Sequence, residues 1–267
     1  MRTKLGFIGR NDLDGVRADA RFAVEHDFVG LEYNYWDGFR DLTAETVRAM
    51  RDILDKHGAR CSMLGLWGWN HLSGDPAERA EAHEMLRRAI EFAGVLGAEV
   101  FTTGGGQMPG ATLDEHLAAF AEVFPAFLEA IDGAGMRTAM YAVHGNSFFD
   151  GIEAYERLWE RFPRVGIKFD PANWHHHGDD YLDVVRRHGD KIAHVHIKEH
   201  LVHNGELASQ PAAGMGDIQW GKVFAFLYEH DYDGPLSIEA HGPVWSQGAM
   251  RDRMHLLTQR YISQFLI

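Results

Sequence analysis

The sequence predicts a single (β/α)8 barrel that extends as one domain over residues 1–267. Short runs of β-branched and apolar residues alternate eight times with longer segments in which apolar residues recur at helical spacing. The length agrees with the roughly 250 residues that such barrels need. We find no Pro/Gly/Ser-rich linker that would divide the chain into two domains.

Each predicted strand is a short apolar run, and each predicted helix follows it along the chain. The predicted strands are residues 5–9, 29–35, 60–67, 99–103, 137–144, 165–170, 192–198 and 236–240. The predicted helices are residues 14–26, 44–56, 77–96, 113–134, 152–161, 181–187, 220–229 and 251–265. Gly58, Gly97 and Gly135 stand where a helix should end, as glycine often does. Residues 200–219 are predicted to be irregular and to lie at the mouth of the barrel.

Charge and cysteine content limit which cellular compartment and which binding partners are expected. The chain has 26 Lys and Arg against 39 Asp and Glu, a net charge of −13, which disfavours nucleic acid and anionic membrane as partners. Cys61 is the single cysteine, so no internal disulfide can form, and a buried structural thiol is expected. No run reaches the roughly 18 apolar residues of a membrane span, and the N-terminus shows no cleavage-site pattern. We therefore expect a cytoplasmic protein, and the sequence leaves open whether it forms a homo-oligomer.

Ligand-competent side chains stand at the ends of three successive predicted strands. Catalytic groups of a barrel gather at these carboxyl ends, and here they are Asp170, His196 and Glu239. Two carboxylates and an imidazole suit one divalent metal ion, with Mn first and Mg, Co, Fe or Zn as alternatives. Because side chains alternate along a strand, His194, His196 and Lys198 share the interior side. We interpret His194 as a core histidine below the site.

Several further residues are candidates for substrate binding at the same rim, and each also has a purely structural interpretation. Glu32 either contacts substrate or supports a ligand, and Lys198 either binds substrate or pairs with Glu32 or Asp170. Four tryptophans could form a wall for a sugar ring or could simply pack in the core: Trp67, Trp69, Trp174 and Trp245. The predicted substrate-binding set is Glu32, Trp67, His71, Asn173, Trp174, Lys198 and His241.

Four runs, FDPAN, HVHIKE, GMGDIQW and LSIEAH, occur in an order and spacing that resemble the xylose-isomerase-like barrels, or sugar phosphate isomerase/epimerase superfamily. The resemblance implies that Asp170, His196 and Glu239 bind metal, and that a glutamate near the end of strand five is the fourth ligand. We match this glutamate to Ala142, followed by His144. His144 could then replace the ligand, act as a base or contact substrate.

The expected activity follows from the metal site and the resemblance together. It is isomerisation or epimerisation of a sugar or keto-sugar by proton transfer through an enediolate, with Glu239 and His144 as catalytic residues. The pocket shows no evident Arg or Lys cluster, which favours an unphosphorylated small-molecule sugar. A lyase that performs β-elimination on a keto-sugar or keto-glycoside is the alternative, because it needs one base only. A binding barrel without turnover would leave the metal residues unexplained.

Overall fold

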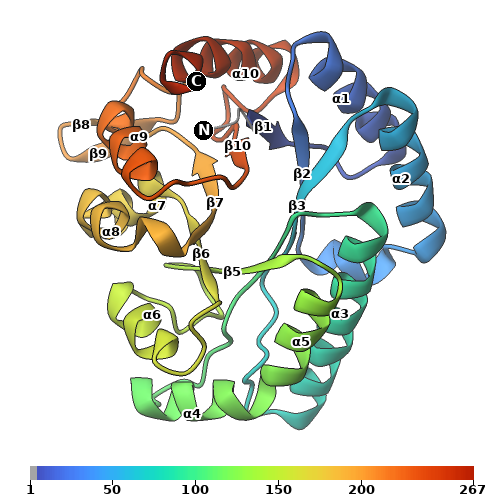
Figure 1. The fold of residues 1–267 in the computed structure, drawn as a ribbon, viewed down its shortest axis with the longest axis vertical. Coiled ribbons are helices and arrows are strands. Elements are labelled where there is room, and N and C mark those ends of the chain that lie inside the picture. The colour runs from blue at the N-terminus through green and yellow to red at the C-terminus, as the bar shows by residue number, and fades with distance from the viewer. Residues whose placement is uncertain (1–4) are drawn as a thin grey trace.

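Eight parallel strands close into a barrel in the computed structural model, which describes residues 5–267. The order around the barrel is β1-β10-β7-β6-β5-β4-β3-β2, which confirms the predicted (β/α)8 fold (Figure 1). The barrel strands are β1 (Leu5–Ile8), β2 (Gly30–Tyr35), β3 (Arg60–Leu66), β4 (Val100–Thr103), β5 (Arg137–Tyr141), β6 (Gly166–Phe169), β7 (Ile192–Ile197) and β10 (Leu236–Ile238).

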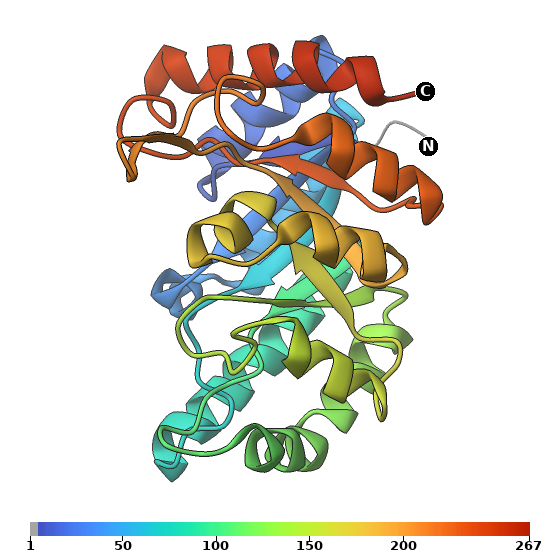
Figure 2. The same ribbon diagram turned by 90° about the vertical axis from the view of Figure 1, so that its left-hand side faces the viewer.

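A ring of helices surrounds the strands. These helices are α1 (Leu13–Glu25), α2 (Ala44–His57), α3 (Pro76–Leu96), α4 (Leu113–Val123), α5 (Pro125–Gly133), α6 (Ile152–Trp159), α7 (Pro171–His177), α8 (Tyr181–His188), α9 (Trp220–Glu229) and α10 (Gly248–Ile262). The last helix, α10, lies beside α1 and closes the ring (Figures 1 and 2). Arg251 of α10 joins the two helices by bonding Asp19 of α1 at 3.1 Å. None of the helices in the described part of the chain has the length and apolar character needed to cross a bilayer.

Two helical segments differ from the prediction. The single helix predicted over residues 113–134 is divided into α4 and α5, because Pro125 has no N–H to continue the helical hydrogen bonds. The short helix α7 was not predicted, although its start carries two ordinary signals. Asp170 accepts a hydrogen bond from the Asn173 backbone N–H at 3.1 Å, and Pro171 occupies the first helical turn.

The segment 200–219 is more ordered than the sequence suggested. It contains an antiparallel hairpin of β8 (Leu201–His203) and β9 (Glu206–Ser209), joined at Asn204-Gly205. Both turn residues have positive φ, 53° and 81°, as expected for the Asn-Gly hairpin turn. After the hairpin, the buried carboxylate of Glu199 accepts hydrogen bonds from the backbone of Gly214 and Ile218, which fixes the run GMGDIQW.

The main core fills the layer between the strands and the helices. Cys61 lies in this layer with 1% of its surface exposed, which confirms the buried thiol, and burial raises its pKa. A smaller apolar cluster joins β3, β4, β5 and β7 through Met63, Val100, Ala139, Tyr141 and Ala193. Above this cluster, polar side chains replace apolar ones on β6, β7 and β10.

Candidate metal and sugar site

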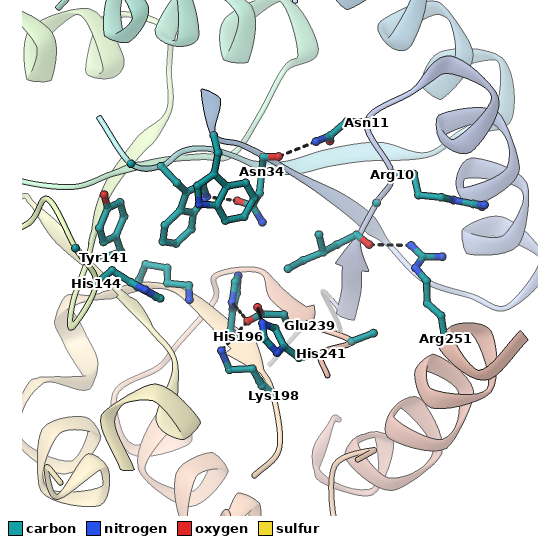
Figure 3. A pocket seen from close by; sticks show the side chains of 18 of the residues that line it. Arg10, Asn11, Asn34, Tyr141, His144, His196, Lys198, Glu239, His241 and Arg251 are labelled. Atoms are coloured by element: carbon teal, nitrogen blue, oxygen red, sulfur yellow. Dashed lines mark hydrogen bonds and ion pairs between the residues drawn. The ribbon is translucent and has the colours of Figure 1, made fainter. Parts of the chain in front are cut away.

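A pocket of about 660 Å³ opens at the carboxyl ends of the strands (Figure 3). Its floor carries His196, Lys198 and Glu239, while Tyr141 and His144 stand on one side and Arg10 and Arg251 on the other. This is the end of the barrel at which barrel enzymes carry their active sites.

Three of the predicted metal ligands converge on this floor. His196 Nδ1 lies 2.9 Å from Glu239 Oε2 and 3.7 Å from Asp170 Oδ2. One ligand atom from each residue lies within 4.8 Å of the others. β7 and β10 pair His196 with Ser237, so Glu239 lies two residues further toward the rim, and its side chain still contacts the imidazole.

Glu32 lies beneath the three predicted ligands and contacts His196. Its Oε1 is 2.7 Å from His196 Nε2, and its Oε2 is 2.7 Å from His194 Nε2. Burial alone would lower the pKa of His196, but the adjacent Glu32 carboxylate raises it to about 10. Glu32 is fully buried and does not line the pocket, so the expected substrate contact is replaced by support of His196. His194 is a core histidine below the site, as interpreted from the sequence.

Two buried lysines form ion pairs with the carboxylates of the site. Lys198 Nζ lies 3.1 Å from Asp170 Oδ2 and 3.2 Å from Glu239 Oε2. Lys168 Nζ lies 3.2 Å from the same oxygen of Asp170. Burial would raise the pKa of Asp170, but Lys198 and Lys168 together hold it well below its ordinary value. The carboxylates are therefore ionised, as ligands of a metal or partners of ammonium groups must be.

The residues present fit a divalent metal ion with three protein ligands. Glu32 occupies the Nε2 side of His196, so Nδ1 faces Asp170 and Glu239, in the arrangement by which a carboxylate orients a metal-binding histidine. Mixed nitrogen and oxygen donors suit several first-row metals and do not select one of them. Glu32, His194 and His196 form a second possible grouping. Both groupings use His196. We therefore assign to Glu32 the role of holding the His196 ring in place, and not that of a metal ligand.

The structure corrects the register of strand five. Tyr141, the last residue of β5, lines the pocket, whereas Ala142 packs in the main core between strands and helices. The strand ends there, and Val143 takes a positive φ of 53°, so the alternation does not continue to His144. The inward position at the end of β5 therefore belongs to Tyr141 and not to Ala142.

His144 stands on the exposed loop after β5. Its Nε2 lies 3.0 Å from Asn173 Nδ2, and its ring meets Trp67 edge-on. Partial burial of its ring and then the charge of Lys168 lower the pKa of His144 to about 4, so the imidazole is neutral. His144 is absent from both possible metal groupings among the described residues, while it does line the pocket. Asn173, a predicted substrate residue, is thus placed where it orients His144.

The predicted tryptophan wall is only partly present. Trp67 lines the pocket, but it stacks on Tyr141 and Trp36 and is 6% exposed, which leaves little of its ring for a ligand. Trp174 is buried in the main core, and Trp69 lies beneath Arg40. The predicted substrate contact of Trp174 does not fit this position, because its ring packs in the main core.

His71 is likewise buried away from the pocket, where its Nε2 lies 3.0 Å from Thr103 Oγ1. Burial and the neighbouring His83 lower its pKa to about 3, so it stays neutral. The predicted substrate contact of His71 does not fit this position. His241, in contrast, is half exposed and lines the pocket beside Glu239, at 3.8 Å.

The pocket contains more cationic side chains than the sequence suggested. Arg10, Lys168, Lys198 and Arg251 all line it, which contradicts the expected lack of Arg and Lys. Each has an acidic partner, however. The lysines bond Asp170, and both arginines bond Asp19, at 2.6 and 3.1 Å. The cations are thus paired within the protein.

Lys168, Trp36 and Tyr141 are among the pocket residues that sequence reasoning missed. Lys168 stands two residues before Asp170, so strand alternation places it on the same side. Trp36 directly follows β2, at the rim. Tyr141 could be predicted as a pocket residue only if the end of strand five was placed correctly. All three line the pocket.

Comparison with known proteins shows that the chain belongs to the family described as xylose isomerase-like TIM barrel, whose profile matches residues 20–259. A ketose 3-epimerase of Arthrobacter globiformis is 26% identical over 250 residues, which cover 88% of this chain and 81% of that protein.

Solved structures with the same fold include a D-allulose 3-epimerase from Methylomonas sp. in complex with D-allulose. It has a TM-score of 0.80 and 20% identity, over 98% of this chain and 97% of that one. The IolI protein with a bound zinc atom also has a TM-score of 0.80, with 16% identity over 99% of both chains.

Proposed function

We propose that the protein is an epimerase or isomerase of a keto-sugar that depends on one divalent metal ion, and that residues 1–267 form one catalytic barrel domain. The observation that carries the proposal is the convergence of Asp170, His196 Nδ1 and Glu239, with Glu32 holding the far side of His196. The zinc-bound IolI protein and the ketose 3-epimerases support this choice. Manganese is our first candidate for the metal.

Asp170, His196 and Glu239 would hold the metal, which polarises a sugar carbonyl when bound. Glu239 Oε2 is engaged by His196 and Lys198, whereas Oε1 lies 3.8 Å from His241, too far for a hydrogen bond. We assign to Glu239 the removal of the proton next to the carbonyl. The Lys198 and Lys168 ammonium groups are placed to donate hydrogen bonds to the substrate oxygen that gains negative charge.

The cationic residues agree with an unphosphorylated substrate. Arg10 and Arg251 share the buried carboxylate of Asp19, so neither guanidinium is a dedicated phosphate ligand. His144, His241 and Trp67 remain candidates for contacts to sugar hydroxyls. The pocket provides donors and acceptors on several sides, as recognition of a polyhydroxylated ligand requires.

A lyase that eliminates a group β to the carbonyl is the second candidate, and Tyr141 is the observation that favours it. A carboxylate at this position would approach the substrate from β5, three strands away from β10 around the barrel. With a phenol there, Glu239 is the only carboxylate among the described residues that line the pocket, and elimination requires only one base. Epimerisation must return the proton from the other face, through Lys168, Tyr141 or water.

The test is incubation of chelator-treated and Mn-reloaded protein with ketohexoses and ring-oxidised hexoses in D2O, followed by NMR. We expect metal-dependent deuterium incorporation next to the carbonyl, and its loss in Glu239→Ala. Glu206→Gln, which changes an exposed carboxylate on β9, is the control and should retain activity. An epimer or isomer supports the first function, whereas an unsaturated ketone supports the lyase. Absence of exchange with every probe would overturn both.

A further inference from the structure

Trp36 is an unusual tryptophan in this chain. All seven tryptophans lie within residues 5–267, and Trp36 is the only exposed one, with 57% of its surface accessible. It lines the pocket at the outer edge, directly after β2. An exposed indole in a concave site marks a surface at which a ligand can be bound.

The indole is held in place by an aromatic stack. Trp36 lies 5.8 Å from Trp67 with an angle of 18° between the rings, and Trp67 lies 4.4 Å from Tyr141 at 17°. Trp67 is itself fixed by a 2.6 Å hydrogen bond from its Nε1 to Asn34 Oδ1. The stack therefore extends from the buried Tyr141 to the exposed Trp36, and only its outer member offers a broad accessible surface.

The inner and outer parts of the pocket differ in chemistry. The floor is formed by charged groups, with Lys168, Lys198 and Glu239 around the proposed metal ligands, which suits the ring that reacts. The residues that line the pocket near Trp36 include the amides of Asn11 and Asn146. Asn146 bonds the Gly68 carbonyl beside Trp36 at 2.7 Å, and Asn11 bonds the Asn34 carbonyl at 2.7 Å. Pyranose rings bind to such combinations of an aromatic surface and amide groups.

The size of the pocket agrees with two rings. Its volume of about 660 Å³ lies within the roughly 300–1,000 Å³ of sites that enclose a drug-sized ligand, whereas a single sugar ring is much smaller. We propose that Trp36, Asn11 and Asn146 form an outer subsite for a second sugar ring, so that the substrate is a glycoside of a keto-sugar. This inference rests on the proposed function and specifies its substrate class.

The experiment compares three probes: a ring-oxidised hexose, its methyl glycoside and a disaccharide that carries the same oxidised ring. We expect kcat/KM of the Mn-loaded protein to be at least about tenfold higher for the disaccharide than for the other two. Trp36→Ala should remove this advantage and leave the values for the single-ring probes nearly unchanged. The control is Val244→Ala, which removes exposed apolar surface near the mouth but outside the pocket, and it should retain the advantage.

Equal kcat/KM for all three probes would overturn the outer subsite while leaving the proposed function intact. An advantage that survives Trp36→Ala would also overturn it, as would an equal loss for every probe. Absence of turnover and of binding with all probes would overturn the proposed function and, with it, this inference. Trp36→Phe keeps an aromatic surface and should retain part of the disaccharide advantage, which separates stacking from damage to the loop.

Discussion

Replacement of Glu32 tests how the site holds its metal. Glu32 touches no pocket surface, yet its two oxygens lie 2.7 Å from His194 and 2.7 Å from His196. Glu32→Gln can still accept a hydrogen bond from His196 Nε2–H and donate one to His194, so it mainly removes the negative charge. Glu32→Ala removes both partners and leaves buried ring nitrogens unpaired.

The two variants should therefore form a graded series. Groups that orient a metal ligand typically change metal affinity by about 10- to 100-fold when they are replaced. We assign the lower value, about 1.4 kcal/mol, to Glu32→Gln and the upper value, about 2.8 kcal/mol, to Glu32→Ala. Titration of chelator-stripped protein with Mn²⁺ in a calorimeter gives the Kd values directly.

The control for this series is His194→Asn, which disturbs the same buried cluster but leaves the contact between Glu32 and His196 in place. Its Kd for Mn²⁺ should stay within about threefold of the unmodified protein. If Glu32→Gln and Glu32→Ala are both folded by circular dichroism and bind Mn²⁺ within twofold of the unmodified protein, Glu32 does not orient a metal ligand.

Three further predictions concern Lys198, His144 and His71. Lys198→Met removes an ammonium that competes for Asp170 and Glu239, so calorimetry should show Mn²⁺ affinity raised by about tenfold, while Lys198→Arg shows no gain. His144→Ala should raise KM and leave kcat within about tenfold, because a neutral imidazole held by Asn173 acts as a substrate contact; a 100-fold fall in kcat would instead assign proton transfer to it. Because the pKa of His71 falls to about 3 in the folded protein, the unfolded chain binds the proton more readily below pH 6.5. Urea unfolding should then show a loss of about 1.7 kcal/mol between pH 6.5 and 5 that is missing in His71→Gln, and parallel curves would contradict this assignment.

The barrel could be predicted from the sequence because the alternation of strands and helices is a local pattern that recurs eight times. Asp170, His196 and Glu239 could be placed together for the same reason, since parallel strands in one barrel end at one rim. Glycines at the ends of helices also have the predicted role. Gly58 and Gly97 adopt positive φ of 73° and 68° where α2 and α3 end.

The details of the pocket depended on features that are not local. An error of one residue at the end of strand five exchanged Tyr141 for Ala142, because a strand's side chains change sides at every residue. His71 is a ligand-competent residue type, but Thr103 and Phe124, which lie much further along the chain, pack against its ring and keep it out of the pocket. The hairpin after β7 had a local signal, Asn204-Gly205, within a segment that composition alone described as irregular.

The most direct test of the account is anomalous diffraction from crystals of the protein loaded with Mn²⁺. We predict one strong anomalous peak bounded by Asp170, His196 Nδ1 and Glu239, with Glu32 on the opposite nitrogen of His196. A peak at another location, or its absence from fully loaded crystals with Lys198 still bridging Asp170 and Glu239, would contradict the metal-dependent site.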